Sequence, residues 1–457
     1  MTVLVSCLFF LAQTFITLDQ ALEIALSENV SVKVADKEIE RSTYAKRGTY
    51  ASLFPQIDGS ASFQRTIKKQ VMYMDFDMSS ITGGGEEGSG SSDGTTGGSS
   101  SNSGGGLEVG RWNTFSAGVS ASMPIINAQL WESLHISGQD VELAVEKARS
   151  SRLEMVSQVK KAFYSCLLAK ESYAVYKEVY DNAEANYART KLKYDAQKAS
   201  DLDLARSATT LANAVPNVYD AANSVALALW QLKAVMGVDL DEDIDVAGEL
   251  YDYASDMSAL YSEEALSLEG NSSLRQLAIQ AEQLASTVKM QKYATLPSLS
   301  LAFAYNYSAM ANDFEFKQYK WTPYSYVGLS INVPIFAGGK YHNNIKAAQV
   351  QADELDLQRQ ESERQIRISI RQNINSMESA LHSFDAADKA VEAAQKAYDI
   401  TQASYEVGSS TQTDLNDAQL ALVQAKMTSA QSIYNYLTAK TSLEQTLGSD
   451  DSQTEEK

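Results

Sequence analysis

Apolar residues alternate with small polar residues in four segments of the chain. The pattern is clear at 115–123, 298–308 and 327–335, where every second residue is apolar and most residues between are Ser, Gly, Ala or Asn. A weaker copy occupies about 58–75, and its shared face carries Phe63, Ile67, Val71 and Tyr73. A period of two is the period of a β-strand with two unlike faces. The pattern therefore predicts four strands, two in each half of the chain.

Long segments with a helical period follow the second strand of each half. After Gly338 and Gly339, apolar residues recur every three or four positions to about Tyr405, and a second helix returns over 415–447. The first half repeats this pattern over 127–194 and 201–237. A helix of about 65 residues is about 100 Å long, far longer than an ordinary globular helix. Pro216 lies inside the returning helix of the first half, and we expect it to interrupt and bend that helix.

The two halves share one frame of residues. Tyr194, Asp203 and Gly237 recur 211 positions later as Tyr405, Asp414 and Gly448, while Asn29 and Pro55 recur 242 positions later as Asn271 and Pro297. A repeat of this length indicates a tandem duplication in which both halves contribute to one pseudo-symmetric object. We therefore divide the chain into a first repeat at 15–250 and a second at 251–448, each with a short helix, two strands and a long helical hairpin.

The remaining segments are predicted not to belong to the folded repeats. Residues 1–14 are largely apolar and resemble the end of a signal peptide, although Cys7 also stands in a lipoprotein-like context. The first repeat then begins with a helix that is expected to start after Thr17, which has the spacing of a capping box with Gln20. Residues 79–110 are nearly all Gly, Ser, Thr and Asp and predict an exposed loop, and 449–457 predict a disordered acidic tail.

Charge and composition exclude several classes of function. The formal net charge is −20, with 58 acidic and 38 basic residues, which disfavours a nucleic-acid partner. The chain has two cysteines, Cys7 and Cys166, and three histidines, none in a metal-binding or nucleophile motif. We therefore expect no enzymatic activity, no catalytic residue, no metal and no cofactor.

The predicted strands have the features of a transmembrane β-barrel. Each has about ten residues and one apolar face, and aromatic residues lie near the strand ends. A soluble β-sandwich is the alternative, but four strands flanked by long helices could not close its core. Four strands cannot close a barrel alone either, and lipid does not tolerate open sheet edges. We therefore expect several copies of the chain to share one barrel.

The segment Tyr405-Glu406-Val407-Gly408, followed by Asp414-Leu415-Asn416-Asp417-Ala418, resembles the TolC family of outer-membrane efflux proteins. The resemblance covers about residues 17–448 and includes the duplication and the proline at each strand-to-helix junction. It implies a mixed α/β fold in a homotrimer. Each protomer would add four strands to a twelve-stranded outer-membrane barrel, and long antiparallel coiled-coil helices would form a periplasmic α-barrel.

The resemblance also assigns roles at the tips of the two helical hairpins. Tyr405, Gly408, Asp414 and Asp417 match the positions of the family's periplasmic gate, where three-fold symmetry would make each Asp a ring of carboxylates. The alternative for both acids is a favourable interaction with a helix N-terminus. Ser410 stands where the family commonly has Arg, so the family's salt-bridged closed state does not transfer directly. The positions expected to contact an adaptor are Lys198, Asp203 and Ser410.

By this resemblance the chain is a passive exit duct of a multi-component efflux or secretion system in the outer membrane. Its implied partners are outer-membrane lipid, a periplasmic adaptor protein and an inner-membrane pump of the RND, ABC or MFS class. The alternative is a scaffold that spans the periplasm and does not conduct.

Overall fold

The computed structural model describes residues 14–72, 107–257 and 267–449. The apolar N-terminal segment with Cys7, most of the Gly/Ser-rich loop and the acidic tail from 450 onward lie outside the described residues. Two compact units make up the chain: a helical unit (Met1–Lys46, Glu132–Lys289 and His342–Lys457) and a strand unit (Arg47–Trp131 and Met290–Tyr341).

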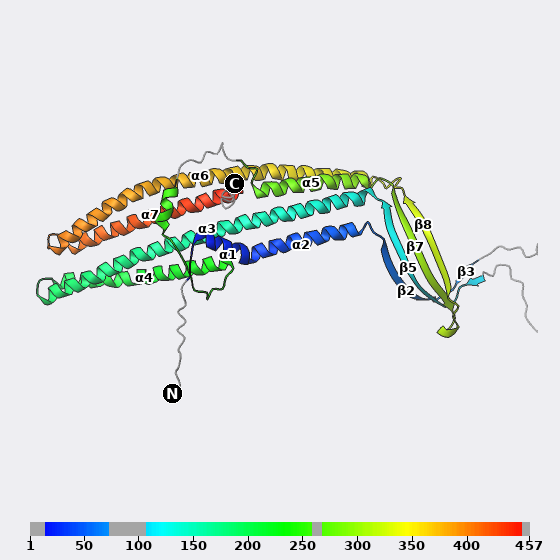
Figure 1. Ribbon diagram of the computed structural model, residues 1–457, viewed down its shortest axis with the longest axis horizontal. Helices are drawn as coiled ribbons and strands as arrows, with labels where there is room; N and C mark the ends of the chain where they lie inside the picture. Colours follow the sequence, from blue (N-terminus) through cyan, green and yellow to red (C-terminus); the bar gives the residue numbers. More distant parts are fainter. Residues whose placement is uncertain (1–13, 73–106, 258–266, 450–457) are drawn as a thin grey trace, which may run out of the picture. The chain divides into compact units, whose positions relative to one another are not determined.

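The strand unit contains one four-stranded antiparallel sheet in the order β2-β5-β7-β8 (Figure 1). Its strands are β2 (Gln56–Arg65), β5 (Asn113–Ile126), β7 (Ser298–Ala311) and β8 (Thr322–Asn332). Two three-residue strands, β3 (Gln70–Met72) and β4 (Leu107–Val109), pair beyond the end of β2 and β5. A short 3-10 helix, η4 (Phe316–Gln318), lies between β7 and β8. The four predicted strands are therefore present.

Two strand boundaries differ from the prediction. The expected strand at 58–75 ends at Arg65, and Ile67 lies between β2 and β3 with 96% of its surface exposed. The backbone leaves the ladder there, at the charged pair Lys68 and Lys69. The strand expected at 327–335 spans 322–332 instead. It begins five residues earlier than expected, and it ends before Pro334, which has no N–H with which to continue the ladder. Residues 107–109, expected in a loop, form β4 instead.

Register makes the two faces of the sheet continuous across all four strands. Ile57 of β2 pairs with Ala121 of β5, which pairs with Phe303 of β7, which pairs with Val327 of β8. Side chains of paired residues lie on the same face, so the apolar positions of the four strands form one surface. Ser, Gly, Asn and Thr form most of the other. Tyr324 and Tyr326 lie on this second face, two positions apart in β8, and their ring centroids are 5.8 Å apart.

The helical unit is built mainly from two long antiparallel helix pairs, α3 with α4 and α6 with α7 (Figure 1). Helices α3 and α6 have 68 and 67 residues, while α4 and α7 have 36 each. The helices are α1 (Leu18–Glu28), α2 (Val30–Ala51), α3 (Ala128–Asp195), α4 (Asp201–Met236), α5 (Ser272–Tyr293), α6 (Lys340–Glu406) and α7 (Gln412–Leu447). A parallel pair of short strands, β1 (Thr14–Ile16) and β6 (Ile244–Val246), and a 3-10 helix, η2 (Leu250–Asp256), complete the unit.

Local sequence explains where these helices begin and end. Thr17 and Gln20 form the expected capping box at the start of α1. Gly237 and Gly448 end α4 and α7 in the left-handed conformation, with φ of 79° and 70°. Pro216 does not interrupt α4, which is one helix from Asp201 to Met236, so the predicted interruption was wrong. The helix continues on both sides of the missing N–H, and it is held there by its packing along the hairpin.

The main hydrophobic core of the helical unit joins both repeats. It includes fully buried side chains from α3, α4 and α7: Phe163, Leu167, Leu232, Ile433, Tyr436 and Leu443. A smaller cluster of Tyr398, Leu415 and Leu422 packs near the end of the α6–α7 hairpin, with Tyr405 against it. This second cluster fixes the hairpin tip that carries the candidate gate residues.

Candidate functional site at the hairpin tips

The two hairpin tips have the same backbone geometry. In the second repeat Gly408 has φ 85°, its N–H donates to Tyr405 O over 3.1 Å, and Ser409 N–H donates to Ser404 O over 2.9 Å. In the first repeat Gln197 has φ 60° and takes the place of Gly408. The matching bonds there join Gln197 N to Tyr194 O (2.8 Å) and Lys198 N to Lys193 O (2.7 Å). The two long helices, α3 and α6, therefore end in separate turns that have the same backbone geometry.

Asp414 begins the returning helix of the second hairpin. Its carboxylate accepts hydrogen bonds from Thr411 N (2.9 Å), Thr411 Oγ1 (2.7 Å) and Ser410 Oγ (3.2 Å), and its own N–H donates to Thr411 Oγ1 (3.2 Å). The bonds from Thr411, and then the bond from Ser410, lower the pKa of Asp414 below its ordinary value of 3.8. The helix-capping role weighed for Asp414 is therefore present in the structure.

Asp203 makes the equivalent cap in the first hairpin. Ser200 Oγ lies 2.7 Å from Asp203 Oδ2, and Asp203 N–H donates to Ser200 Oγ over 3.1 Å.

The other two positions expected to contact an adaptor are Lys198 and Ser410. Lys198, three residues after the last residue of α3, is exposed. Ser410 does not replace the family's Arg electrostatically, but its hydroxyl holds Asp414.

Asp417 differs from Asp414, although both lie on the first turns of α7. Its side chain is exposed and has no hydrogen bond or ion pair within the described part of the chain. A free carboxylate at this position has its full charge available for solvent or cations. Asp414 therefore caps the start of α7, whereas Asp417 makes no such contact within the described residues.

Several polar contacts join the tip of one hairpin to the tip of the other. Arg189 Nη1 on α3 lies 2.5 Å from Glu406 Oε1 on α6, with both side chains about half exposed. The Tyr405 hydroxyl lies 3.4 Å from Thr190 Oγ1, and Lys193 Nζ lies 5.5 Å from the centre of the Tyr405 ring. Two further bonds join the hairpins: Asn186 to Gln412 (3.1 Å) and Asn416 to Thr210 (3.3 Å).

Arg189 was not among the residues predicted from the sequence. The family resemblance places a cation two residues after Gly408, on the same hairpin, where this chain has Ser410. The structure places the cation on the opposite hairpin, 217 residues from Glu406. The available signal was the pair Arg189 and Lys193 at a spacing of four, which puts both charges on one helix face at the end of α3.

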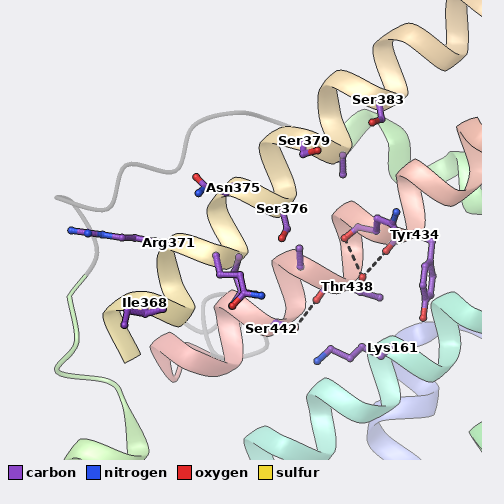
Figure 2. A pocket seen from close by; sticks show the side chains of 15 residues that line it. Lys161, Ile368, Arg371, Asn375, Ser376, Ser379, Ser383, Tyr434, Thr438 and Ser442 are labelled. Atoms are coloured by element: carbon purple, nitrogen blue, oxygen red, sulfur yellow. Dashed lines mark hydrogen bonds between the residues drawn. The ribbon is translucent and has the colours of Figure 1, made fainter. Parts of the chain in front are cut away.

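A cavity of about 950 Å³ lies between α6 and α7 (Figure 2). The α6 residues that line it, 368–383, lie well before the end of α6 at Glu406. Its lining is mostly hydroxyl and amide groups, including Ser376, Ser379, Thr438 and Ser442. Lys161 reaches it from α3, and partial burial lowers the pKa of this lysine. The cavity has no carboxylate among its lining residues.

The described residues contain no cluster of three or more His, Cys, Asp and Glu that could hold a metal ion. His135, His342 and His382 are exposed. In the part of the chain that the structure describes, no helix combines the length and the apolar character needed to cross a membrane.

The two-faced sheet and the long helical hairpins define a channel-type outer-membrane protein, and comparison with known proteins agrees. The family description "Outer membrane efflux protein" matches residues 21–238 and 265–449. The chain belongs to this family, and the predicted resemblance to TolC-like proteins is confirmed. A search of the curated proteins finds no match.

Solved channels share the fold over nearly the whole chain. The Campylobacter jejuni CmeC outer membrane channel is 19% identical, with a TM-score of 0.69 over 94% of this chain and 85% of its own. The open state of the Neisseria gonorrhoeae MtrE outer membrane channel is 17% identical, with a TM-score of 0.70 over 94% and 89%. Vibrio cholerae VceC is 14% identical, with a TM-score of 0.69 over 94% and 96%.

These findings establish the class of function. The chain is an outer-membrane exit duct of an efflux system, located in the outer membrane with a periplasmic extension. Its family consists of channel proteins, not enzymes.

Proposed function

We propose that three copies of the chain close one twelve-stranded barrel and that the hairpin tips form its periplasmic entrance. The observation that carries this proposal is the four-stranded sheet with two unpaired edges, β2 and β8. The three pairings are all antiparallel, so β8 runs opposite to β2. The β8 edge of one copy can therefore pair antiparallel with the β2 edge of another, which closes the sheet without an exposed edge.

The exposure of the apolar face supports the same assembly. Val327, Leu329 and Ile331 of β8 are 67–72% exposed, although a soluble sheet would bury such residues against a core. The opposite face is lined by small polar residues such as Ser116, Ser120 and Ser300. An apolar outside and a polar inside are the requirements for a barrel that conducts water-soluble substrates through lipid.

Cross-linking between edge strands tests the trimer. In a Cys7→Ser background, Ser60→Cys on β2 would be combined in turn with Tyr326→Cys, Gly328→Cys and Ser330→Cys on β8, all on the polar face. We expect at least one pair to give covalent dimers and trimers on a denaturing gel. Combining Ser60→Cys with Leu329→Cys, on the opposite face, is the matched control. Monomers only, from every polar-face pair in membranes, would reject the shared barrel.

The candidate gate comprises Tyr405, Gly408, Asp414 and Asp417, with Arg189 as the cation that acts on it. In this proposal the Arg189–Glu406 ion pair and the contacts of Tyr405 with Thr190 and Lys193 hold the two tips together and keep the entrance narrow. Three-fold symmetry turns Asp414 and Asp417 into two rings of carboxylates, which attract cations and repel each other at close range.

Single-channel recording tests both parts of the gate. Glu406→Gln removes an exposed ion pair worth about 0.2–1 kcal/mol in each copy, so three copies together should raise the open probability by about tenfold. Glu392→Gln, an exposed acid on the same helix, is the control. Asp414→Ala with Asp417→Ala should reduce cation selectivity and block by multivalent cations, and unchanged values for both would reject the acidic gate.

The same tips are the proposed docking place for a periplasmic adaptor, which would link the duct to an inner-membrane pump of the RND, ABC or MFS class. Support comes from the exposure of the turn at Lys198 and from the equivalent turn at Ser410 in the second hairpin. Cysteine-directed photocrosslinking from Lys198→Cys and Ser410→Cys in cells should capture an adaptor. A cross-linker placed at Lys292→Cys on α5 should not.

A further inference from the structure

The apolar face of the sheet has a defined height. Its rows run from Leu299, paired with Ile331, to Ala309, paired with Phe115, which is ten residues along β7. Ten residues at about 3.4 Å each cover about 34 Å, and a barrel strand tilted by about 40° reduces this to about 26 Å along the membrane normal. This height matches the apolar band of an outer-membrane barrel, about 25 Å.

Arg65 lies one row beyond this band, on the same face. It is the last residue of β2, two positions after Phe63, and it pairs with Asn113. All four sheet strands connect to long helices at their other end, and those helices extend into the periplasm. The Arg65 row is therefore at the outer surface, at the level of the lipid headgroups.

Cations gather at this end of a chain that is acidic overall. Between them, β5, β7 and β8 contain no charged residue. The loop end has six cations within short distances along the chain: Arg65, Lys68, Lys69, Arg111, Lys317 and Lys320. The described acids at this end are Glu108, Asp313 and Glu315. In the described part of the chain, no ion pair involves Arg65, Lys68, Arg111, Lys317 or Lys320.

Aromatic rings lie near two of these cations. The Arg65 guanidinium lies 6.0 Å from the centre of the Phe314 ring, and Lys69 Nζ lies 4.8 Å from the centre of the Trp112 ring. Phe314 belongs to the β7–β8 loop, which folds back so that its ring lies 5.9 Å from that of Phe63.

Arg111 contacts the end of strand β7. Its Nη1 donates to Met310 O over 3.2 Å, and within the described residues no other hydrogen bond or ion pair engages its guanidinium. The Phe314 ring and the Met310 carbonyl position Arg65 and Arg111, and neither partner carries a negative charge.

We propose that this cationic and aromatic end of the sheet, centred on Arg65 and Arg111, binds the phosphate group of an anionic lipid in the outer leaflet. The guanidinium fork matches a phosphate oxygen pair, and the acyl chains of such a lipid would extend along the apolar face directly below Arg65. A soluble phosphate compound would use the charges but not the adjoining apolar surface, so a lipid satisfies both features of the surface.

Lipid selectivity tests the inference. The full chain would be reconstituted in nanodiscs of neutral phosphatidylcholine, with and without phosphatidic acid, and native mass spectrometry would count the retained phospholipids. Arg65→Gln with Arg111→Gln removes two cations, each worth about fivefold in affinity for an anionic headgroup. We expect preferential retention of phosphatidic acid by the wild type and a loss of about 25-fold in the double variant. Lys191→Gln, at the hairpin tip, should change nothing.

Three outcomes would overturn the proposal: equal retention of both lipids by the wild type, an unchanged preference in the double variant, or an equal loss in Lys191→Gln. Inorganic phosphate that displaces phosphatidic acid at matched concentration would indicate a site for free phosphate instead. Conductance of the double variant in neutral lipid shows whether the channel still forms, so a failed barrel cannot be mistaken for a missing lipid site.

Discussion

Asn29 and Asn271 make the same hydrogen bond in the two halves of the molecule. The side-chain amide of Asn29 donates to Val235 O, and that of Asn271 donates to Thr446 O, each over 2.6 Å. Each asparagine precedes a 22-residue helix, and each accepting carbonyl lies in the last turn of a returning hairpin helix. Carbonyls in a last helical turn lack intrahelical partners. The duplication has therefore kept one device that ties the end of each hairpin to the helix before the strands.

Loss of this amide should destabilise the helical unit. Asn271→Asp keeps the oxygen that accepts from Leu274 N over 2.9 Å but places a carboxylate oxygen against Thr446 O. We expect a cost of about 1–3 kcal/mol in the free energy of unfolding, because a hydrogen bond at a 5% exposed residue is replaced by a repulsion. Thermal melts followed by circular dichroism measure it. Asn217→Asp, an exposed site on α4, is the control, and an equal melting temperature for both variants would contradict the account.

The tip of the first hairpin should be stabilised by a glycine. Gln197 adopts φ 60°, a conformation that costs a non-glycine residue about 1–2 kcal/mol, while the equivalent Gly408 adopts φ 85° without this cost. Glycine loses more chain entropy on folding, by about 0.5–1 kcal/mol. Gln197→Gly should therefore gain about 0.5–1 kcal/mol, and Gly408→Ala should lose a similar amount. Local hydrogen exchange at the two tips would show this, and slower exchange in Gly408→Ala than in the wild type would contradict it.

The cap at Asp414 should respond to acid in one direction. Hydrogen bonds from Thr411 lower the pKa of Asp414, so the ionised form stabilises the folded state above pH 3.8, and this stabilisation disappears as the pH falls through the lowered folded-state pKa. Asp414→Asn should melt below the wild type at pH 7, and the gap should narrow only below about pH 3.8. Asp417→Asn makes the same charge change three residues on and should leave the melt at pH 7 unchanged. Identical melts for wild type and Asp414→Asn at pH 7 would reject the capping role.

Cys166 should report unfolding. Its side chain is fully buried, and burial raises the pKa of its thiol to about 12. At pH 8 only about one thiol in ten thousand would be ionised, and the reactive form is the thiolate. In a Cys7→Ser background, maleimide should therefore label the protein in denaturant but not in its folded state. Labelling of the folded protein within minutes at pH 8 would show that this core opens readily.

Helix ends were the most predictable part of the fold. Gly338, Thr411 and Gly448 act through their own backbone or first neighbours, so α6 and α7 could be placed to within a few residues. The alternation within β5 and β7 was equally local. Register, by contrast, could not be read from one strand. It is the register that joins Ile57, Ala121, Phe303 and Val327 into a single apolar face.

Contacts between distant segments were not predictable. Strand β1 pairs with β6 across some 230 residues, and three residues carry too weak a pattern to be recognised as a strand. The Arg189–Glu406 pair depends on how two hairpins pack, which no spacing in the sequence encodes. The gate residues were found by resemblance to a family, and the role of Asp414 as a cap was visible from its position after Thr411.

Planar-bilayer recording of the purified protein tests the central claim most directly. A duct closed by three copies should insert and give discrete conductance steps of one size, and Glu406→Gln should spend more time in the open state. If the protein inserts as a stable trimer but neither the wild type nor Glu406→Gln passes current at any voltage, the molecule is a non-conducting scaffold and the exit-duct account is contradicted.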